Sequence, residues 1–548
     1  MSIRFVVPVV LALVSVFTAP ARSQTANVCP AIETVEIGRN RELRVNGEPF
    51  FPIMLWLQNH ERIDDGLKSG INTFCANGGS LGKKDYLDQL ARNGLYGIVH
   101  FQDDHKEVLD HSHRLGWIHS DEPDMSKTVS DAAVRAAAGM NINSSTPLSR
   151  IVDGNPGSWT VLDPLVGAEI TVKLEKPVTV QSLAVSATVS SGLPVAKEIV
   201  FLADGDEILK ANLENKRGQQ KFELAKPATL ERLTVKVVSS YPGDNQWGSL
   251  GEIEGFNELG KNVLLSPPRL VPRTLPEDVI AQYHRIKTAD PVRPVLVTFT
   301  GSFFEKASRY DEATRKALYP EFVKGSDVAG FDIYPIFGSG YPSRLNWVAD
   351  ATEELVRIAG PQRPMYAWIE TNKGSKWMTL SKQLDVEPKH TRCETWMAII
   401  RGATAIGYFT HRWQPDYKQF APEEEMVAEL KRLNGQITRL APAILAAPSK
   451  ARIDMTLDDG LPCHFKATDC DGALYIFAQN IDLGPEPESK RQFEQITPRA
   501  GKATITVEGL KAGTSIEVID EQRTIKATAG KFTDDFAPLS EHIYRLEL

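Results

Sequence analysis

The sequence predicts an α/β fold: a (β/α)8 TIM barrel with an inserted β-sandwich and a C-terminal β-sandwich. Short apolar runs alternate with amphipathic segments before about residue 125 and again after about residue 268, which is typical of a parallel barrel. Between these two stretches, and again after about residue 451, alternation of period two with Gly, Pro and Asn turns indicates antiparallel β-sandwiches.

The predicted barrel strands are short apolar runs, most of which end in polar residues. They cover residues 51–56, 71–76, 95–101, 117–120, 293–299, 329–335, 364–370 and 405–413. Helices are predicted between or after them at residues 62–69, 83–92, 105–114, 277–288 and 423–440. Four strands before the interruption and four after it make eight, with right-handed crossovers between parallel neighbours.

These patterns divide the chain into five segments. Residues 1–23 are predicted to be a secretory signal peptide, because Arg4 precedes an apolar run that ends in small residues. The halves of the barrel are residues 30–126 and 268–446, the insert is 127–262, and the C-terminal sandwich is 451–548. The first apolar run is too short to span a bilayer, and no other stretch is long enough. We therefore expect a secreted or periplasmic protein without membrane insertion.

The charge and the cysteines exclude several kinds of partner and cofactor. The chain has 62 Lys and Arg against 70 Asp and Glu, a net charge of −8, which argues against nucleic acid as a partner. A carbohydrate or another neutral molecule fits better. The five cysteines lack metal-ligand spacing, so we expect no catalytic metal and no cofactor. Cys463 and Cys470 could close a hairpin disulfide in an oxidising compartment.

Two glutamates that follow predicted barrel strands are the candidate catalytic residues. Glu122 lies in the segment Asp121-Glu122-Pro123-Asp124, and Glu370 ends the strand at 364–370. Such barrels keep their chemistry at the C-terminal ends of the strands. Cleavage of a glycosidic bond needs two carboxyl groups, one to protonate the leaving oxygen and one to attack or to activate water. The alternatives are a helix N-terminal acid for Glu122 and a solvated strand end for Glu370.

The placement of these glutamates resembles that in the clan A retaining glycoside hydrolases. In that clan the acid/base glutamate follows strand four, usually as Asn-Glu-Pro, and the nucleophile ends strand seven. The resemblance covers about residues 35–126 and 268–446, and the Asn-Gly-Glu-Pro-Phe-Phe-Pro segment at 46–52 is similar to many secreted bacterial barrels. It implies a retaining mechanism with Glu122 as acid/base and Glu370 as nucleophile.

The same resemblance implies roles in substrate binding for four residues. Asp121 stands where the clan has an asparagine that contacts the sugar 2-hydroxyl, and Asn77 stands where many members have an arginine. Tyr334 would orient the nucleophile, and Trp413 would be a platform on which a sugar stacks.

Three more residues are assigned to substrate binding from the sequence pattern alone. Asp332 lies inside an apolar strand, so it is either a hydrogen-bonded residue of the barrel interior or a substrate contact. Trp56 is either core or substrate-binding. His119 is interpreted as a polar residue at the barrel mouth rather than as a metal ligand.

The insert resembles a discoidin-like domain of the coagulation factor 5/8 C type. The matching residues are Ile151-Val-Asp-Gly154, Trp159, Ile170-Thr-Val-Lys-Leu174 before Pro177-Val-Thr-Val180, and Gly251-Glu-Ile-Glu-Gly-Phe256. Domains of that family often bind galactose-type sugars, and the resemblance also implies a structural calcium near Asp153 and Glu252.

We therefore expect a secreted glycoside hydrolase that acts on a poly- or oligosaccharide, with a β-linked bond as the expected target. Two alternatives stay open. One is a non-catalytic carbohydrate-binding protein on a degenerate glycosidase barrel, because Asp121 and Asn77 depart from the clan pattern. The other is an inverting hydrolase, in which one carboxylate activates water.

Overall fold

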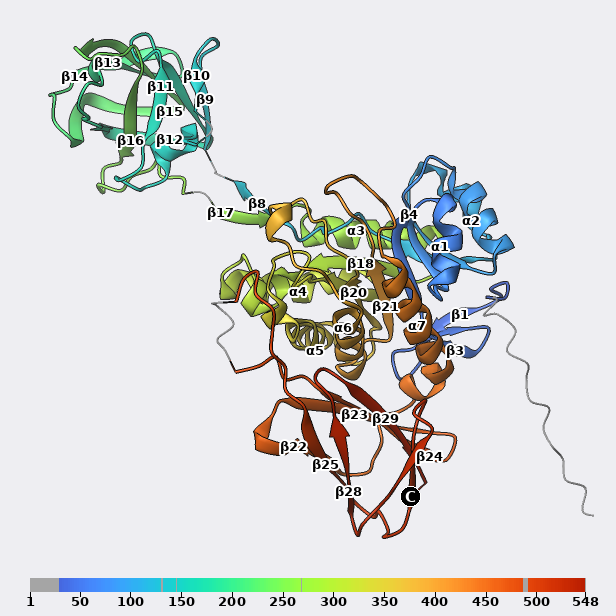
Figure 1. Cartoon of the computed structure of the whole chain (residues 1–548). Helices are drawn as coiled ribbons and strands as arrows, with labels where there is room; N and C mark the ends of the chain where they lie inside the picture. Colours follow the sequence, from blue (N-terminus) through green and yellow to red (C-terminus); the bar gives the residue numbers. More distant parts are fainter. Residues whose placement is uncertain (1–28, 130–131, 144, 268, 486–490, 548) are drawn as a thin grey trace, which may run out of the picture. The chain divides into compact units, whose positions relative to one another are not determined.

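The computed structural model describes residues 29–129, 132–143, 145–267, 269–485 and 491–547. The chain forms two compact units (Figure 1). The larger contains Met1–Glu122, Pro276–Ala307 and Lys316–Leu548, and the smaller contains Pro123–Leu275 and Ser308–Arg315. The predicted signal peptide, residues 1–23, lies outside the described residues.

Eight parallel strands close into a barrel in the order β18-β19-β20-β21-β4-β5-β6-β7, which confirms the predicted barrel. Their bounds are β4 Ile53–Gln58, β5 Thr73–Asn77, β6 Tyr96–His100, β7 Arg114–Ile118, β18 Val295–Thr300, β19 Val328–Asp332, β20 Met365–Glu370 and β21 Ala405–Phe409. Nearly every residue of these strands is buried, and strands covered on both faces are continuous apolar runs.

Large aromatic side chains fill the barrel beside glycines. A Cβ atom on Gly330 would lie 2.2 Å from the ring of Tyr366, and one on Gly407 would lie 2.0 Å from the ring of Trp368. Both distances are far below van der Waals contact, so these strands approach the two rings only because they carry glycine there. Trp368 also packs on Trp56, with 5.1 Å between the ring centroids.

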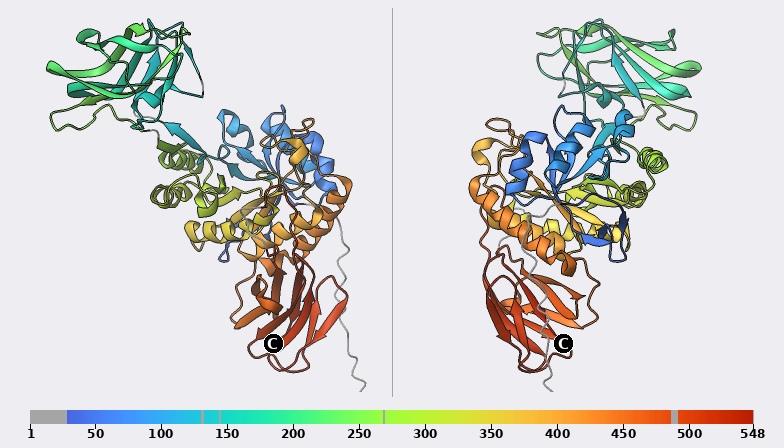
Figure 2. Two further views of the ribbon diagram at one scale, coloured as in Figure 1. Left: turned by 60° about the vertical axis from the view of Figure 1, so that its left-hand side comes forward. Right: turned by 90° about the vertical axis from the view of Figure 1, so that its right-hand side faces the viewer.

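Helices surround this barrel (Figure 2). They are α1 Ile63–Lys68, α2 Lys83–Arg92, α3 Pro276–Ala289, α4 Glu312–Phe322, α5 Trp347–Ala359, α6 Pro388–Ile400 and α7 Glu424–Ile444. The helix predicted at residues 105–114 is wrong: Asp103–Val108 form a 3₁₀ helix, and Arg114 already belongs to β7. A buried ion pair between Arg114 and Asp290 holds that arginine in the strand.

The N-terminal segment adds a small antiparallel sheet to the larger unit. Its strands are β1 Val35–Ile37, β2 Leu43–Val45 and β3 Glu48–Phe50. They pair in the order β1-β2-β3, and Asn46 and Gly47 make the turn between β2 and β3 with positive φ angles of 53° and 81°.

The smaller unit is a two-layered β-structure. Its strands are β9 Ala133–Ala136, β10 Asn141–Ile142, β11 Thr160–Asp163, β12 Glu169–Ala187, β13 Val195–Ala203, β14 Asp206–Asn212, β15 Gly218–Tyr241 and β16 Gly248–Phe256. The first half of β12 pairs with β9 and its second half with β16, and register shifts separate the halves. The long strands β12 and β15 therefore run through both layers, which enclose an apolar core around Phe201 and Leu233.

A separate two-stranded ribbon also belongs to this unit. It joins β8 Ser126–Val129 to β17 Arg269–Pro272 in antiparallel register. The strands of the smaller unit follow β7 and precede β18 in the chain.

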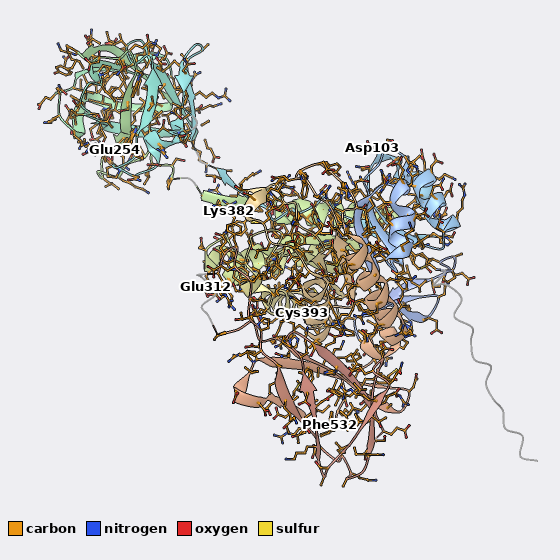
Figure 3. All side chains as sticks on the ribbon, in the orientation of Figure 1. Asp103, Glu254, Glu312, Lys382, Cys393 and Phe532 are labelled. Carbon is orange, nitrogen blue, oxygen red and sulfur yellow. The ribbon has the colours of Figure 1, made fainter. Side chains whose placement is uncertain are left out.

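Two antiparallel sheets form the C-terminal part of the larger unit. One contains β22 Ile453–Leu457, β25 Gly501–Val507 and β28 Lys531–Phe536; the other contains β23 Cys463–Cys470, β24 Ala473–Asn480, β26 Ser515–Val518, β27 Arg523–Lys526 and β29 Glu541–Leu546. Phe532, labelled in Figure 3, lies in the core that both sheets share.

These sheets pack on helix α6 of the barrel. Arg392 Nε donates to Glu541 Oε1 at 2.6 Å, and Gln479 Nε2 donates to the carbonyl oxygen of Cys393 at 3.0 Å. Trp396 stacks on Phe477 at 6.0 Å between centroids. The outer face of α6 is therefore held by the C-terminal sheets, and its inner face lies against β20.

The proposed disulfide between Cys463 and Cys470 is wrong. The two cysteines stand at opposite ends of one strand, β23, where they pair with Asn480 and Ala473 respectively. At about 3.3 Å per residue, seven steps along a strand separate them by about 23 Å, far beyond disulfide reach. All five cysteines are free thiols.

Candidate active site

Polar side chains gather where the eight parallel strands end. Asn77 ends β5, Asp332 ends β19 and Glu370 ends β20, while Asp121 and Glu122 follow β7. Because parallel strands all end on the same side, these residues share the C-terminal mouth of the barrel.

Tyr334, two residues after β19, brings four of the predicted site residues together. Burial raises the pKa of its hydroxyl well above the ordinary value, and the charges of Asp332, Asp121, Glu122 and Glu370 raise it further, in that order. Carboxyl groups from three strand ends therefore lie close enough to Tyr334 for their charges to act on its hydroxyl.

Glu122 has an unusual backbone conformation. Its φ angle is +48°, in the left-handed region that costs a residue with a side chain about 1 kcal/mol or more. Ala76 and Leu57, beside the ends of β5 and β4, also have positive φ angles, of 62° and 50°. Three residues at the ends of barrel strands therefore have a strained backbone. Such strain is common at functional sites, where the surrounding structure holds a residue in an unfavourable conformation. The side chain of Glu122 is half-buried, and that of Asp121 is exposed.

Glu370 is buried completely beneath the mouth. Its Oε1 accepts a hydrogen bond from the amide of Ile336 at 2.9 Å, and its Oε2 accepts one from the amide of Phe337 at 2.6 Å. Burial raises its pKa to about 7, although both amides and a hydrogen bond from Glu394 oppose that rise. The side chain predicted to be a nucleophile therefore has both oxygens engaged by the loop that follows β19.

Sequence reasoning missed Glu394 on helix α6. It is as fully buried as Glu370, and burial followed by the charge of Glu370 raises its pKa well above the ordinary value. The only sequence signal is one acid two residues before the apolar run 396–400.

Aromatic rings form a cluster beside the carboxyl groups. Trp413 lies 5.6 Å from Phe409, 5.7 Å from Trp377 and 5.9 Å from Phe337, measured between ring centroids. Tyr334 joins the cluster through Phe409, at 4.9 Å. Trp377 is 56% exposed, so a large apolar ring is presented to solvent next to charged groups. Such amphipathic surfaces suit ligands with alternating C–H faces and hydroxyl groups.

The structure gives three of the predicted substrate-binding residues internal partners. Asn77 closes its own loop: its Nδ2 donates to Leu81 O at 2.8 Å, and its Oδ1 accepts from the amide of Gly79. His119 is buried, with Nε2 2.8 Å from the carbonyl oxygen of Gly325. Trp56 is 7% exposed and packs on Trp368 inside the barrel.

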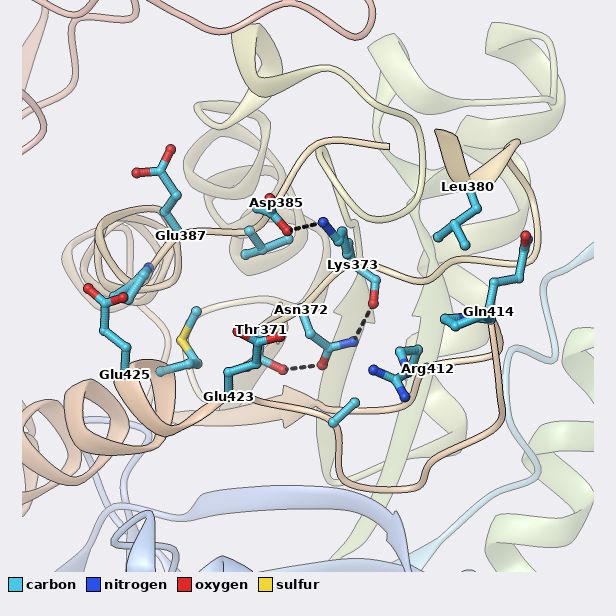
Figure 4. Close-up of a pocket in the computed structure, with 15 residues that line it drawn as sticks. Thr371, Asn372, Lys373, Leu380, Asp385, Glu387, Arg412, Gln414, Glu423 and Glu425 are labelled. Atoms are coloured by element: carbon cyan, nitrogen blue, oxygen red, sulfur yellow. Dashed lines mark hydrogen bonds and ion pairs between the residues drawn. The ribbon is translucent and has the colours of Figure 1, made fainter. Parts of the chain in front are cut away.

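A cavity of about 450 Å³ lies next to this mouth (Figure 4). Its floor includes Thr371 and Asn372, which directly follow Glu370, and its walls include the ion pair of Lys373 with Asp385 at 2.7 Å. Arg412 also lines the cavity and pairs with Asp416 at 2.6 Å. Neither Glu122 nor Glu370 lines the cavity, so it extends the polar mouth without containing the carboxyl group of either residue.

The described residues contain no group of three or more His, Cys, Asp and Glu side chains arranged to hold a metal ion. The pair implied by the discoidin-like resemblance is present in the smaller unit. Glu252 Oε1 accepts from the amide of Gly154, and its buried Oε2 faces no hydrogen-bond donor. Burial, and then a hydrogen bond to Asp153 and its charge, raise the pKa of Glu252 to about 8. Carboxyl oxygens are the ligand type that Ca²⁺ takes, and one oxygen of Glu252 has no hydrogen-bond partner among the described residues.

Comparison with known proteins gives only distant likenesses. No protein-family model and no curated protein matches the chain. The family 32 carbohydrate-binding module of Clostridium perfringens NanJ, in complex with galactose, matches at 16% identity over 23% of this chain and 97% of that one, with a TM-score of 0.19.

Two other solved structures match larger shares of the chain. The CBM32-1 and CBM32-2 domains of Clostridium perfringens ZmpB, in complex with GalNAc, match at 14% identity and a TM-score of 0.20, over 25% of this chain and 40% of that one. An Anoxybacillus alpha-amylase matches at 11% identity and a TM-score of 0.31, over 50% of this chain and 57% of that one. The match spans about half the length of these two chains. At such TM-scores the likenesses carry no argument about activity, so the proposal below depends on the site itself.

Proposed function

We propose that this protein is a glycoside hydrolase whose active site is the C-terminal mouth of the barrel. One observation carries the proposal: Asp332, Asp121, Glu122 and Glu370 lie at the ends of neighbouring barrel strands, their charges act on Tyr334, and Tyr334 packs on an aromatic cluster that includes the exposed Trp377. Carboxyl groups are what glycosidic cleavage needs, and the aromatic surface suits the C–H face of a sugar. Glu122 is the proposed general acid/base, because it is half-buried at a strand end and has a strained backbone.

The second carboxyl group is either Glu370 or Asp332. A nucleophile must touch the anomeric carbon, but Glu370 is wholly buried and both of its oxygens accept backbone hydrogen bonds. Asp332 ends the neighbouring strand and is only half-buried. Burial therefore favours Asp332 as the nucleophile or water-activating base, with Glu370 below it as support.

Aryl glycosides test both the activity and the choice of nucleophile. We expect the wild-type protein to hydrolyse at least one member of a panel of α- and β-aryl glycosides. We expect Asp332→Ala to abolish this activity and added azide to restore part of it, giving a glycosyl azide of inverted configuration. Azide rescue of Glu370→Ala instead would make Glu370 the nucleophile. If the folded wild-type protein hydrolyses no member of the panel, the proposed hydrolase activity is contradicted.

A non-catalytic carbohydrate-binding protein is the second candidate. The specific observation in its favour is the burial of Glu370, which removes one of the two predicted catalytic groups from the surface. Titration calorimetry with oligosaccharides separates the candidates: binding of an oligosaccharide that is never cleaved supports the second.

We also propose that the protein works outside the cytoplasm. The N-terminal sequence pattern supports export. Among the described residues we find no helix with the length and hydropathy of a membrane span.

We further propose that Asp153 and Glu252 hold a structural cation such as Ca²⁺ in the smaller unit. Because the pKa of Glu252 is about 8, a cation must displace a proton at lower pH, so its affinity should rise with pH.

Calcium at a hundredfold excess over its Kd should raise the melting temperature of this unit by about 5 °C or more, with a larger effect at pH 8.5 than at pH 6. Glu252→Gln should remove the effect, while Glu207→Gln, at an exposed acid of the same unit, should keep it. If calcium does not change the wild-type melting temperature at either pH, the proposed cation site at Asp153 and Glu252 is contradicted.

A further inference from the structure

The carboxyl group of Glu370 holds a specific segment of the barrel mouth. Its two oxygens accept from consecutive backbone amides, those of Ile336 and Phe337, at 2.9 and 2.6 Å. These amides lie in residues 334–340, the mouth segment, which also turns on itself through hydrogen bonds from Gly338 to Tyr334 and from Gly340 to Ile336. The position of Glu370 therefore sets the position of this loop.

The mouth segment carries part of the proposed sugar-binding surface. Phe337 packs against Phe409, Trp413 and Trp377 at centroid distances of 5.3 to 5.9 Å. Tyr334, at the start of the segment, is the residue on which the site carboxyl groups converge. Movement of the segment would displace both the aromatic cluster and the tyrosine.

Helix α6 supports Glu370 from the other side. Thr391 Oγ1 donates to the main-chain oxygen of Glu370 at 2.8 Å. Glu394, three residues later and so on the same face of the helix, brings a second carboxyl group against the first. Both glutamates are completely buried, and no basic side chain contributes to the pKa of either among the described residues.

Two buried carboxylates without a cation repel each other strongly, so this pair must hold a proton. The pKa of Glu394 is raised further by the charge and hydrogen bond of Glu370, whereas Glu370 is held lower by the amides of the mouth segment. Both carboxyl oxygens of Glu394 are buried and have no other hydrogen-bond partner among the described residues. We therefore place the proton on Glu394, where its hydroxyl can donate to Glu370. Glu370 then accepts three hydrogen bonds, two from the loop and one from the helix.

We propose that Glu394 is a positioning residue whose buried carboxyl group completes the hydrogen bonding of Glu370 and thereby fixes residues 334–340 at the barrel mouth. The consequence for catalysis rests on the proposed function, but the structural part does not. Helix α6 is itself fixed by the C-terminal sheets through Arg392, Cys393 and Trp396. The C-terminal domain thus supports the mouth through one helix.

Other titratable groups lie around the pair on every side. Towards the mouth they are Tyr334 and, beyond it, Asp332, Asp121 and Glu122. Towards the C-terminal sheets they are Cys393, which the charge of Glu394 reaches, and beyond it Arg392 and Glu541. On α6 itself His390 lies one turn earlier, and burial lowers its pKa to about 4. The variants below change only the side chain of Glu394 and leave these groups in place.

Hydrogen–deuterium exchange of residues 334–340 tests the proposal without any substrate. Glu394→Leu removes the donor, and we expect exchange of the Ile336 and Phe337 amides to become about tenfold faster or more. Glu394→Gln keeps a donor of the same length, so we expect it to restore protection. Thr438→Val, which removes a helix-internal hydroxyl on α7 distant in sequence, is a control that should leave these amides unchanged.

The pH dependence provides a second readout. Burial raises the pKa of Glu394 well above its ordinary value, so the donor that its proton provides is present at neutral pH and is lost as the pH rises through that raised pKa. After correction for intrinsic rates, exchange of the mouth segment in the wild type should therefore accelerate in alkali, once the pH exceeds the raised pKa of Glu394. The Glu394→Gln protein cannot lose its donor and should show no such acceleration.

Wild-type protection in a folded Glu394→Leu protein, or the same pH dependence in wild type and Glu394→Gln, would overturn the proposal. If Glu394→Leu does not fold, the comparison of wild type with Glu394→Gln still tests it. In an active enzyme Glu394→Leu should raise KM more than it lowers kcat, with Glu394→Gln restoring KM. If the amides of residues 334–340 exchange as expected but the protein has no hydrolase activity, the positioning role of Glu394 is supported and only the proposed function is rejected.

Discussion

The Glu122→Gln protein is expected to lose about 10²- to 10⁴-fold in kcat/KM on aryl glycosides with poor leaving groups, which is the usual contribution of general acid catalysis. Glutamine keeps the size of the side chain and cannot donate a proton to a departing oxygen. The loss should be much smaller on 2,4-dinitrophenyl glycosides, because that leaving group departs without protonation. Steady-state kinetics on the two substrate types measures the difference directly.

A matched control distinguishes the loss of proton donation from the mere loss of a negative charge near the barrel mouth. Glu61→Gln makes the same change at an exposed acid in the short 3₁₀ helix His60–Arg62 after β4 and should leave kcat/KM near the wild-type value. Circular dichroism and the melting temperature should match the wild type for both variants, since Glu122 is only half-buried. Equal losses of Glu122→Gln on good and poor leaving groups would exclude a general-acid role.

The Asp290→Ala protein is expected to lose about 3–5 kcal/mol of stability in the larger unit, which is the usual result of breaking a buried ion pair. Asp290 Oδ2 lies 2.7 Å from Nη2 of Arg114 and accepts a hydrogen bond from Trp117 Nε1 at 2.8 Å. Arg114 is completely buried, with its guanidinium 4.0 Å over the ring of Trp117. Without Asp290 the barrel would contain a buried, unpaired positive charge next to β7.

Urea unfolding followed by tryptophan fluorescence measures this loss, because Trp117 lies in the affected strand. Asp290→Asn keeps an acceptor for Trp117 without the charge, so its loss should be intermediate. Asp88→Ala, which removes a surface partner of Lys84, should change stability little. An Asp290→Ala protein as stable as Asp88→Ala would contradict the stabilising role of the pair.

The same pair has a pH signature. Burial alone would raise the pKa of Asp290, but the charge of Arg114 and hydrogen bonds outweigh burial and lower it. A depressed folded-state pKa means that this contribution to stability is present near neutral pH and is lost as the pH falls through that pKa. The difference between wild type and Asp290→Ala should therefore shrink in acid.

Much of the fold was predictable because local patterns of apolar and polar residues determine its strands and helices. The eight barrel strands are apolar runs with helices between them, and the β-rich segments alternate with period two. The prediction failed where a tertiary partner overrides the local pattern. Arg114 looks like the end of a polar helix, but Asp290, far along the chain, pairs with it inside the barrel.

The candidate site divides in the same way. The sequence alone located Asp121, Glu122, Asp332 and Glu370, because a polar residue at the end of a buried parallel strand must lie at the mouth of the barrel. It could not decide which of them solvent reaches.

That decision depends on residues remote in the chain. The amides of the mouth segment engage both oxygens of Glu370, and Glu394 reaches it from a helix whose outer face the C-terminal sheets hold. Burial and proton sharing are properties of such assembled surroundings, so only the tertiary structure determines whether a strand-end carboxylate faces substrate or supports the loop above it.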